Sequence, residues 1–89
     1  MDASESSIKE VVRKFIGENY FAAGVHPDLR DDDSFLQKGI IDSIGVIELT
    51  SFIQNQYDIK IKVPEIIPKN FDTIDNLARY IRMKLKGDA

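Results

Sequence analysis

The sequence contains no cysteine and no tryptophan, and His26 is its single histidine. Without cysteine the protein can form no disulfide, and it has neither a thiolate nucleophile nor a sulfur ligand for a metal. A zinc site at His26 would need carboxylates for its remaining ligands, so we do not interpret His26 as a ligand or a general base. No apolar run approaches the roughly 20 residues that a membrane-spanning helix needs. The N-terminus also lacks the basic and apolar regions of a signal peptide, which favours a cytoplasmic protein.

Basic residues are scarce over the first two thirds of the chain. Residues 1–58 contain five Lys and Arg against eleven Asp and Glu, whereas residues 59–89 contain seven against four. Nucleic-acid binding depends on clustered cations, so this acidic first part argues against a nucleic-acid partner. The expected helix over 43–56 has no Lys or Arg, which excludes a small DNA-binding helical domain. Positive charge complements the dipole at the end of a final helix, and we interpret four side chains there as a solvated face: Arg79, Arg82, Lys84 and Lys86.

The chain has 89 residues, enough for one small domain but too few for two independent cores. We therefore expect a single domain over residues 1–89, with an ordered helical core over about 7–86. Met1 and the polar end Gly87-Asp88-Ala89 favour a discrete protein, and we expect a monomer.

The first predicted helix begins at Ser7. Ser7 and Glu10 fit a capping box, in which each side chain accepts a hydrogen bond from an exposed backbone N–H group. We expect the helix to end near 21–23, where Gly24 stops it. Its apolar residues recur at helical spacing: Ile8, Val11, Val12, Phe15 and Ile16.

Two further helices follow the same periodicity. The second runs from about Ser43 to Gln56 with Asp42 or Ser43 as its N-cap, and the last begins after Asp72 or Thr73. The apolar positions are Val46, Leu49, Phe52, Ile53 and Tyr57 in the second helix, and Ile74, Leu77, Ala78, Ile81 and Leu85 in the last.

The connection over 24–42 is long for a compact domain, and such loops usually have a function or their own packing. Phe35 and Leu36 are the expected anchors to the core. The acidic run 31–33 suggests a calcium loop, but an EF-hand starting there would need Gly at its sixth position and Glu at its twelfth. The chain has Leu36 and Asp42 at these positions, so we interpret the run as a solvated acidic loop.

Residues 58–63 alternate apolar and polar side chains like a strand, yet no second strand is available to pair with them. We expect an extended segment with Ile59, Ile61 or both turned inward. A short helical turn follows, which Pro64 begins and Pro68 closes. The predicted fold is all-α: a small antiparallel bundle of three main helices plus one short helix.

The segment 39–49 is the most informative part of the chain because it places Ser43 at the start of a helix. Unpaired N–H groups and a partial positive charge make that position favourable for a phosphate. Ile44 and Ile47 could give a partner apolar contact there, although buried positions would also explain them. Ser43 by itself could be a plain N-cap. It does not lie in a Gly-x-Ser-x-Gly elbow, so a hydrolase triad has no support.

Three stretches together carry a family resemblance: Asp42-Ser43-Ile44, Ile47-Glu48-Leu49, and Asn70-Phe71-Asp72-Thr73-Ile74 at the opening of the last helix. With the size and the helix order, they extend over most of the chain. The chain resembles the acyl carrier protein family, including the peptidyl and aminoacyl carriers. The resemblance implies an acyl-carrier-like bundle. It also implies a 4′-phosphopantetheine arm, which a phosphopantetheinyl transferase moves from coenzyme A onto the Ser43 hydroxyl.

The resemblance further implies a non-catalytic carrier that holds an acyl or aminoacyl group as a thioester on the arm. Its partners would be the transferase, an adenylating ligase or synthase that loads the arm, and downstream acyl- or aminoacyl-accepting enzymes. Four residues are then candidates for partner recognition: Asp42, Ile44, Ile47 and Glu48. Among the two isoleucines we favour Ile44.

The chain departs from the fatty-acid carriers in the helix after Ser43. Ile44 replaces the usual Leu, and Glu48 is the single acid between Ser43 and Tyr57. This weak acidity, with Gly45, looks more like the aminoacyl, D-alanyl or peptidyl carriers. A fatty-acid or polyketide carrier remains the nearer alternative. An unmodified helical adaptor that binds partners noncovalently is the alternative from another class.

Overall fold

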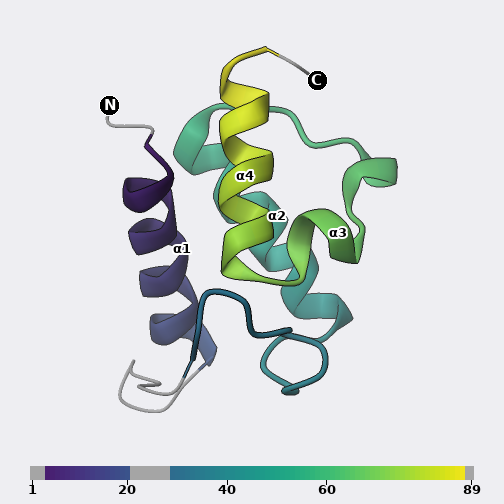
Figure 1. Cartoon of the computed structure of the whole chain (residues 1–89). Coiled ribbons are helices and arrows are strands. Elements are labelled where there is room, and N and C mark those ends of the chain that lie inside the picture. Colours follow the sequence, from purple (N-terminus) through teal and green to yellow (C-terminus); the bar gives the residue numbers. More distant parts are fainter. Residues whose placement is uncertain (1–3, 21–28, 88–89) are drawn as a thin grey trace.

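The computed structural model describes residues 4–20 and 29–87 (Figure 1). The described part is helical and contains no strand. None of its helices is long and apolar enough to cross a bilayer. The elements are α1 (Glu5–Tyr20), α2 (Ser43–Tyr57), the 3-10 turn η2 (Val63–Glu65), α3 (Pro68–Phe71) and α4 (Ile74–Leu85). The predicted all-α fold with three main helices is confirmed.

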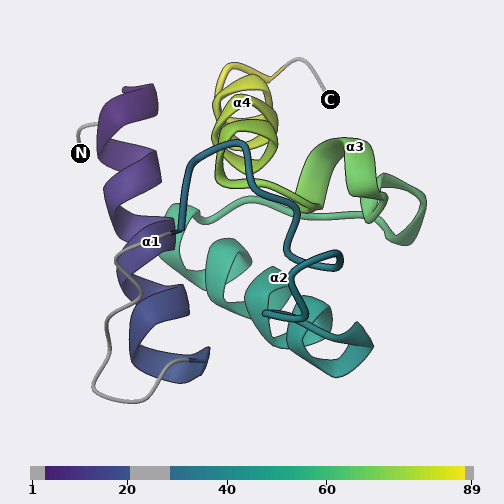
Figure 2. The ribbon, with the colours of Figure 1, turned by 60° about the horizontal axis from the view of Figure 1, so that its bottom comes forward.

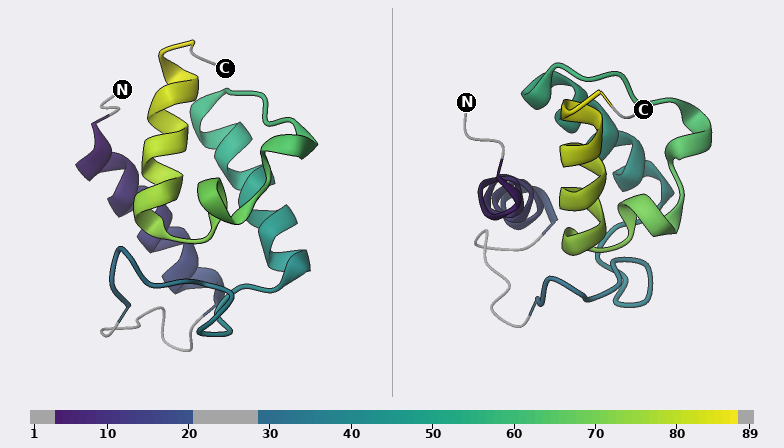
Figure 3. Two further views of the ribbon diagram at one scale, coloured as in Figure 1. Left: turned by 45° about the vertical axis from the view of Figure 1, so that its right-hand side comes forward. Right: turned by 45° about the horizontal axis from the view of Figure 1, so that its top comes forward.

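Helix α4 contacts both α1 and α3, and buried side chains of α1, α2 and α4 share one core. Figures 1 and 3 show α1 and α4 running in opposite directions, and Figure 1 shows α2 crossing behind α4. Figure 2 shows the connection that leads into α2 passing close to the first turn of α4. A hydrogen bond of 3.0 Å from the Asp75 N–H to the Asp31 carbonyl joins the two. The connection therefore packs on the bundle.

The core consists of the predicted apolar stripes. Burial of these faces supplies most of the driving force for folding, because isolated short helices are only marginally stable in water. Val46 and Leu85 are partly buried against the core. The fully buried side chains include Ile8, Val12 and Ile16 of α1, Leu49 and Ile53 of α2, and Ile74, Leu77, Ala78 and Ile81 of α4.

Helix α1 begins one turn earlier than the sequence pattern suggested. Ser4 Oγ accepts a hydrogen bond of 3.2 Å from the Ser7 N–H, and the Ser4 carbonyl accepts one from the Ile8 N–H. Ser4 therefore caps the helix, and the predicted cap at Ser7 is wrong. The predicted helix end at 21–24 lies outside the described residues, as does His26.

The long connection is held to the bundle by an ion-pair network around Asp31. Lys9 and Arg13 of α1 both contact its carboxylate, and Lys9 also pairs with Asp75 at 2.7 Å. Arg13 donates a further hydrogen bond of 2.8 Å to the Leu29 carbonyl. The interpretation of 31–33 as a solvated acidic loop is therefore wrong for two of its residues: Asp31 pairs with α1 although it is 40% exposed, and Asp33, 15% exposed, pairs with Lys38.

Of the two predicted loop anchors, only Phe35 is buried. Its side chain is 2% exposed, whereas Leu36 is 53% exposed. The Phe35 N–H donates to the Asp72 carbonyl at 2.8 Å, and the Leu36 N–H donates to the Asp72 carboxylate at 3.0 Å. These bonds fix the backbone so that one of two adjacent side chains points inward and the other must point out.

The segment after α2 is extended, as predicted, with Ile61 buried and Ile59 packed partly against the core. The Ile61 N–H donates to Gln54 Oε1 at 2.8 Å instead of to a second strand. The short helical turn was predicted between Pro64 and Pro68, but Pro68 opens α3 and does not close the turn. Both prolines occupy early helical positions, where the missing N–H costs nothing.

The basic end of α4 is not wholly solvated. Lys84 has a side chain that is only 6% exposed, and its Nζ lies 3.2 Å from Glu65 Oε1. The same carboxylate accepts hydrogen bonds from the Tyr80 hydroxyl and the Lys62 N–H, both at 3.0 Å. The prediction of a solvated face is wrong for Lys84, because Glu65 fastens η2 to α4 through it.

These contacts give the protein a specific pH dependence. The Lys62 N–H, followed by the Lys84 and Tyr80 side chains, lowers the pKa of Glu65 below its usual value. A lowered folded-state pKa stabilises the fold above the ordinary glutamate pKa of about 4.3, and this stabilisation is lost as the pH falls toward the folded value. We expect the unfolding free energy of Glu65→Gln to fall less than that of the wild type between about pH 6 and pH 3.

Urea unfolding at each pH measures this difference. Glu10→Gln, which changes an exposed carboxylate of α1, serves as the control and should keep the wild-type slope. Equal slopes for Glu65→Gln and the wild type would show that Glu65 gives no pH-dependent stability.

Candidate functional site

Three consecutive residues at the start of α2 have three different roles. Ile41 is 2% exposed and belongs to the core. Asp42 has an extended backbone (φ −98°, ψ −172°), and its Oδ1 accepts a hydrogen bond of 2.8 Å from the Gly45 N–H. Ser43 is the first residue of the helix and is exposed. The core therefore fixes where α2 begins, and the side chain that begins it faces solvent.

The geometry decides between the two predicted caps. Asp42 is the N-cap, so the interpretation of Ser43 as the cap is wrong. Within residues 4–20 and 29–87, no group forms a hydrogen bond with the Ser43 hydroxyl. An exposed hydroxyl without a partner at the positive end of a helix suits a phosphate ester, since N–H groups and the dipole favour an anion there. The site fits a phosphopantetheine group.

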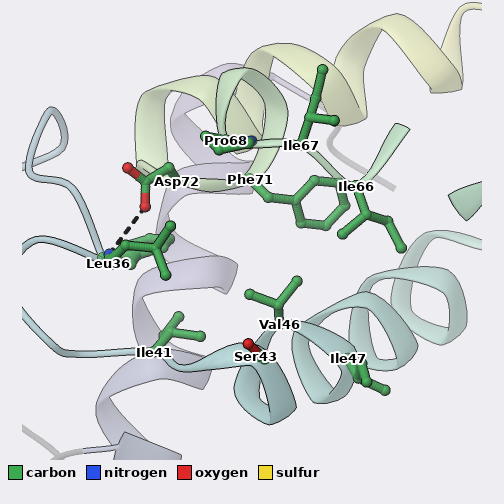
Figure 4. A pocket seen from close by; sticks show the side chains of 11 residues that line it. Leu36, Ile41, Ser43, Val46, Ile47, Ile66, Ile67, Pro68, Phe71 and Asp72 are labelled. Carbon is green, nitrogen blue, oxygen red and sulfur yellow. Dashed lines mark hydrogen bonds between the residues drawn. The ribbon is translucent and has the colours of Figure 1, made fainter. Parts of the chain in front are cut away.

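A pocket of about 290 Å³ opens beside Ser43, between α2 and the segment that contains α3 (Figure 4). Figure 4 shows Val46 of α2 facing Ile66 and Phe71 across the opening. Asp72 is the one charged residue among those that line it. Its carboxylate already accepts hydrogen bonds from Ser34 Oγ and the Leu36 N–H. Apart from Ser43, the remaining lining is apolar and includes Phe35, Leu36, Ile41, Ile47, Ile67 and Pro68.

Both isoleucines that follow Ser43 point away from the core. Ile44 is 69% exposed and Ile47 is 65% exposed, so the interpretation of either as buried is wrong. Leu36 and Ile67, at 53% and 42% exposed, line the pocket as Ile47 does. Exposed large apolar side chains that gather in one place mark an interaction surface. We call Leu36, Ile44, Ile47 and Ile67 the apolar rim.

The single charge of α2 is not free. Glu48 Oε1 accepts a hydrogen bond of 3.2 Å from the Tyr20 hydroxyl, which also lies 3.2 Å from the Gly45 carbonyl. Burial, followed by the hydrogen bond to Glu48, raises the pKa of Tyr20 to about 12. Sequence reasoning missed this contact between α1 and α2.

A signal for it was nevertheless present. Glycine within a helix costs stability relative to alanine, so its occurrence there suggests a close approach. A Cβ at position 45 would lie 2.8 Å from Ile41 Cγ2 and 3.2 Å from the Tyr20 hydroxyl oxygen. Gly45 is therefore the position at which two neighbouring side chains contact the backbone of α2.

Residues 7–81 match the family described as "Phosphopantetheine attachment site". The chain belongs to this family. Among similar proteins, Aminoacyl carrier protein 2 of Bradyrhizobium diazoefficiens is 30% identical over 81 residues, which cover 91% of this chain and 85% of that protein. The D-alanyl carrier protein of Streptococcus uberis is 27% identical over 55 residues, which cover 62% of this chain and 68% of that protein.

Membership of the phosphopantetheine attachment family confirms several predictions. The resemblance to the acyl carrier proteins, the helical fold and phosphopantetheine as the cofactor are all confirmed. The function of the chain is that of a carrier, and a carrier requires partner enzymes, including one that attaches the arm.

The close approach at Gly45 makes a prediction for Gly45→Ala. Because Ile41 is buried and cannot move cheaply, the new methyl group should lower the unfolding free energy by about 1–2 kcal/mol, even though alanine favours helix. Urea unfolding measures the change. Asn55→Ala, at an exposed position of the same helix, is the control and should be neutral or slightly stabilising. A Gly45→Ala protein as stable as the wild type would contradict the close approach.

Proposed function

We propose that Ser43 is the attachment point of the phosphopantetheine arm and that the arm holds an aminoacyl group. The exposed hydroxyl of Ser43 at the capped start of α2, which has no hydrogen-bond partner in the described part of the chain, is the observation that carries the attachment site. The arm supplies the terminal thiol that a thioester needs. This chain has no cysteine and therefore no thiol of its own. The chain presents the cargo, and we propose that it catalyses no step itself.

The choice of an aminoacyl cargo is supported by similarity and by charge. The two similar carriers named above are an aminoacyl and a D-alanyl carrier. Helix α2 has one acidic residue, Glu48, and no basic one. A fatty acid is the alternative cargo, but α2 lacks the acidic face that the family resemblance leads us to expect of fatty-acid carriers.

In the attachment reaction, the Ser43 oxygen forms a bond to the phosphorus of the pantetheine half of coenzyme A. The pyrophosphate bond breaks, the adenosine bisphosphate half leaves, and the hydroxyl proton passes to a base of the transferase. Asp42 contributes by holding the first turn of α2 in place, because it caps the Gly45 N–H. The partners we propose are this transferase, an adenylating ligase or synthase, and an aminoacyl-accepting enzyme. We propose that the whole chain is one monomeric carrier domain in the cytoplasm.

An intact-mass measurement tests the attachment site. After incubation with coenzyme A and a broad-specificity phosphopantetheinyl transferase, the wild type should gain the mass of one phosphopantetheine, and Ser43→Ala should gain none. Ser51→Ala, another exposed serine of α2, is the control and should gain the full mass. A wild type without any mass gain would favour the unmodified helical adaptor over the carrier.

We also propose that partners recognise the surface around Ser43 through Asp42, Ile44 and Ile47. The exposure of the two isoleucines supports this role, because it leaves their apolar surface available for an interface. Glu48, the fourth residue predicted for recognition, already has a partner within the protein in Tyr20.

The recognition surface makes a prediction for the transferase reaction. Ile44→Ser and Ile47→Ser should each lower kcat/KM about fivefold or more, as truncation of an interface anchor does. Val63→Ser is the matched control, because Val63 is 80% exposed and does not line the pocket beside Ser43. Steady-state kinetics with coenzyme A and the three variants measures the effect. An equal loss for Val63→Ser would indicate a general effect of surface polarity.

A further inference from the structure

Tyr20 joins two helices at the point where the modified residue lies. Its hydroxyl lies 3.2 Å from the Gly45 carbonyl and 3.2 Å from Glu48 Oε1. A tyrosine hydroxyl has one proton to donate, so it serves these two acceptors in turn or shares the proton between them. Both acceptors belong to α2, and Gly45 is two residues after Ser43. In either case the bond ties the first turns of α2 to α1.

The ring of Tyr20 is held in place from two sides. Phe15 packs edge-on against it with ring centroids 6.2 Å apart, and Phe15 itself stacks on Phe52 of α2 at 4.2 Å. On the other side, the missing side chain of Gly45 lets the ring approach the helix backbone, because a Cβ there would lie 3.3 Å from Tyr20 Cε1. The hydroxyl is therefore aimed by packing, and the glycine makes room for it.

We propose that Tyr20 is a positioning residue for the attachment reaction, and that Glu48 acts through Tyr20 and not by contact with a partner. The proposal rests on the proposed function, in which Ser43 receives the arm. Ser43 and the two isoleucines of the apolar rim on α2 form one surface only while the start of α2 keeps its orientation. Asp42 caps the first turn of α2, and the hydrogen bond from Tyr20 holds that turn against α1.

Kinetics of the transferase with coenzyme A test this role. If Tyr20→Phe leaves α2 correctly oriented for only part of the time, the apparent affinity falls by that fraction. We expect a KM about fivefold higher and an unchanged kcat. Tyr80→Phe is a matched control, since it removes a bond of 3.0 Å to Glu65, also from tyrosine to glutamate, elsewhere in the fold. It should lose comparable stability in urea and keep the wild-type KM.

Two substitutions of Glu48 separate an internal role from a partner contact. Glu48→Gln keeps an acceptor for Tyr20 and should keep nearly the wild-type KM. Glu48→Ala removes the acceptor, and should raise KM less than Tyr20→Phe does because the Gly45 carbonyl remains. The KM of the double variant Glu48→Ala with Tyr20→Phe should be no higher than that of Tyr20→Phe alone, since Glu48 and Tyr20 act through one interaction.

Several outcomes would overturn the proposal. A wild-type KM for Tyr20→Phe would show that Tyr20 does not position the site. Equal damage by Glu48→Gln and Glu48→Ala, additive with Tyr20→Phe, would show that the carboxylate contacts the enzyme. The amide NMR signals of residues 43–45 in the unmodified protein should shift in Tyr20→Phe and not in Tyr80→Phe. This last readout decides the role of Tyr20 even if the wild type accepts no arm, a result that would refute the proposed function instead.

Discussion

The site depends on the burial of Ile41 immediately before α2. Once this side chain is in the core, Asp42 must be extended, and its carboxylate reaches the Gly45 N–H to start the helix. The helical period then puts Gly45 and Leu49 on the inner face of α2. The same period turns residues 43, 44 and 47 outward. The exposure of two isoleucines is thus a consequence of register, and not a packing fault.

The acidic connection that leads into α2 is held by charged side chains whose partners cannot be recognised from the sequence. Asp31 contacts Lys9 and Arg13, and Asp72 accepts bonds from the backbone and side chain of the loop around Phe35. Exposed ion pairs contribute little individually, typically about 0–1 kcal/mol each. Here they accompany a buried phenylalanine, so the network serves mainly to fix the path of the connection. That path brings Ile41 to the core and, with it, Ser43 to the surface.

Periodicity predicted the three main helices well because burial of an apolar stripe is a local property of the sequence. It failed where the answer depends on a distant segment. Lys84 looked solvated because no spacing shows that Glu65 comes next to it. Ser4 and Ser7 are equally good caps by residue type, and the hydrogen bond that shows the cap at Ser4 is visible only in the structure. The same holds for the site. Ser43 was predicted because its motif is local, whereas Tyr20 was not predicted because it belongs to a distant helix.

The proposed docking surface, mostly apolar and with few charges, suits a protein whose cargo is attached covalently. A carrier must leave each enzyme it visits, and differences in affinity between related complexes lie mainly in the dissociation rate. Strong ion pairs at the surface would slow that step. The cargo needs no affinity of its own, because a flexible tether raises its effective concentration at the docked enzyme. In the proposed function, a few exposed apolar side chains beside Ser43 then give enough contact to orient the carrier. Glu48 is the one charged side chain of α2, and the hydrogen bond from Tyr20 holds its carboxylate in place.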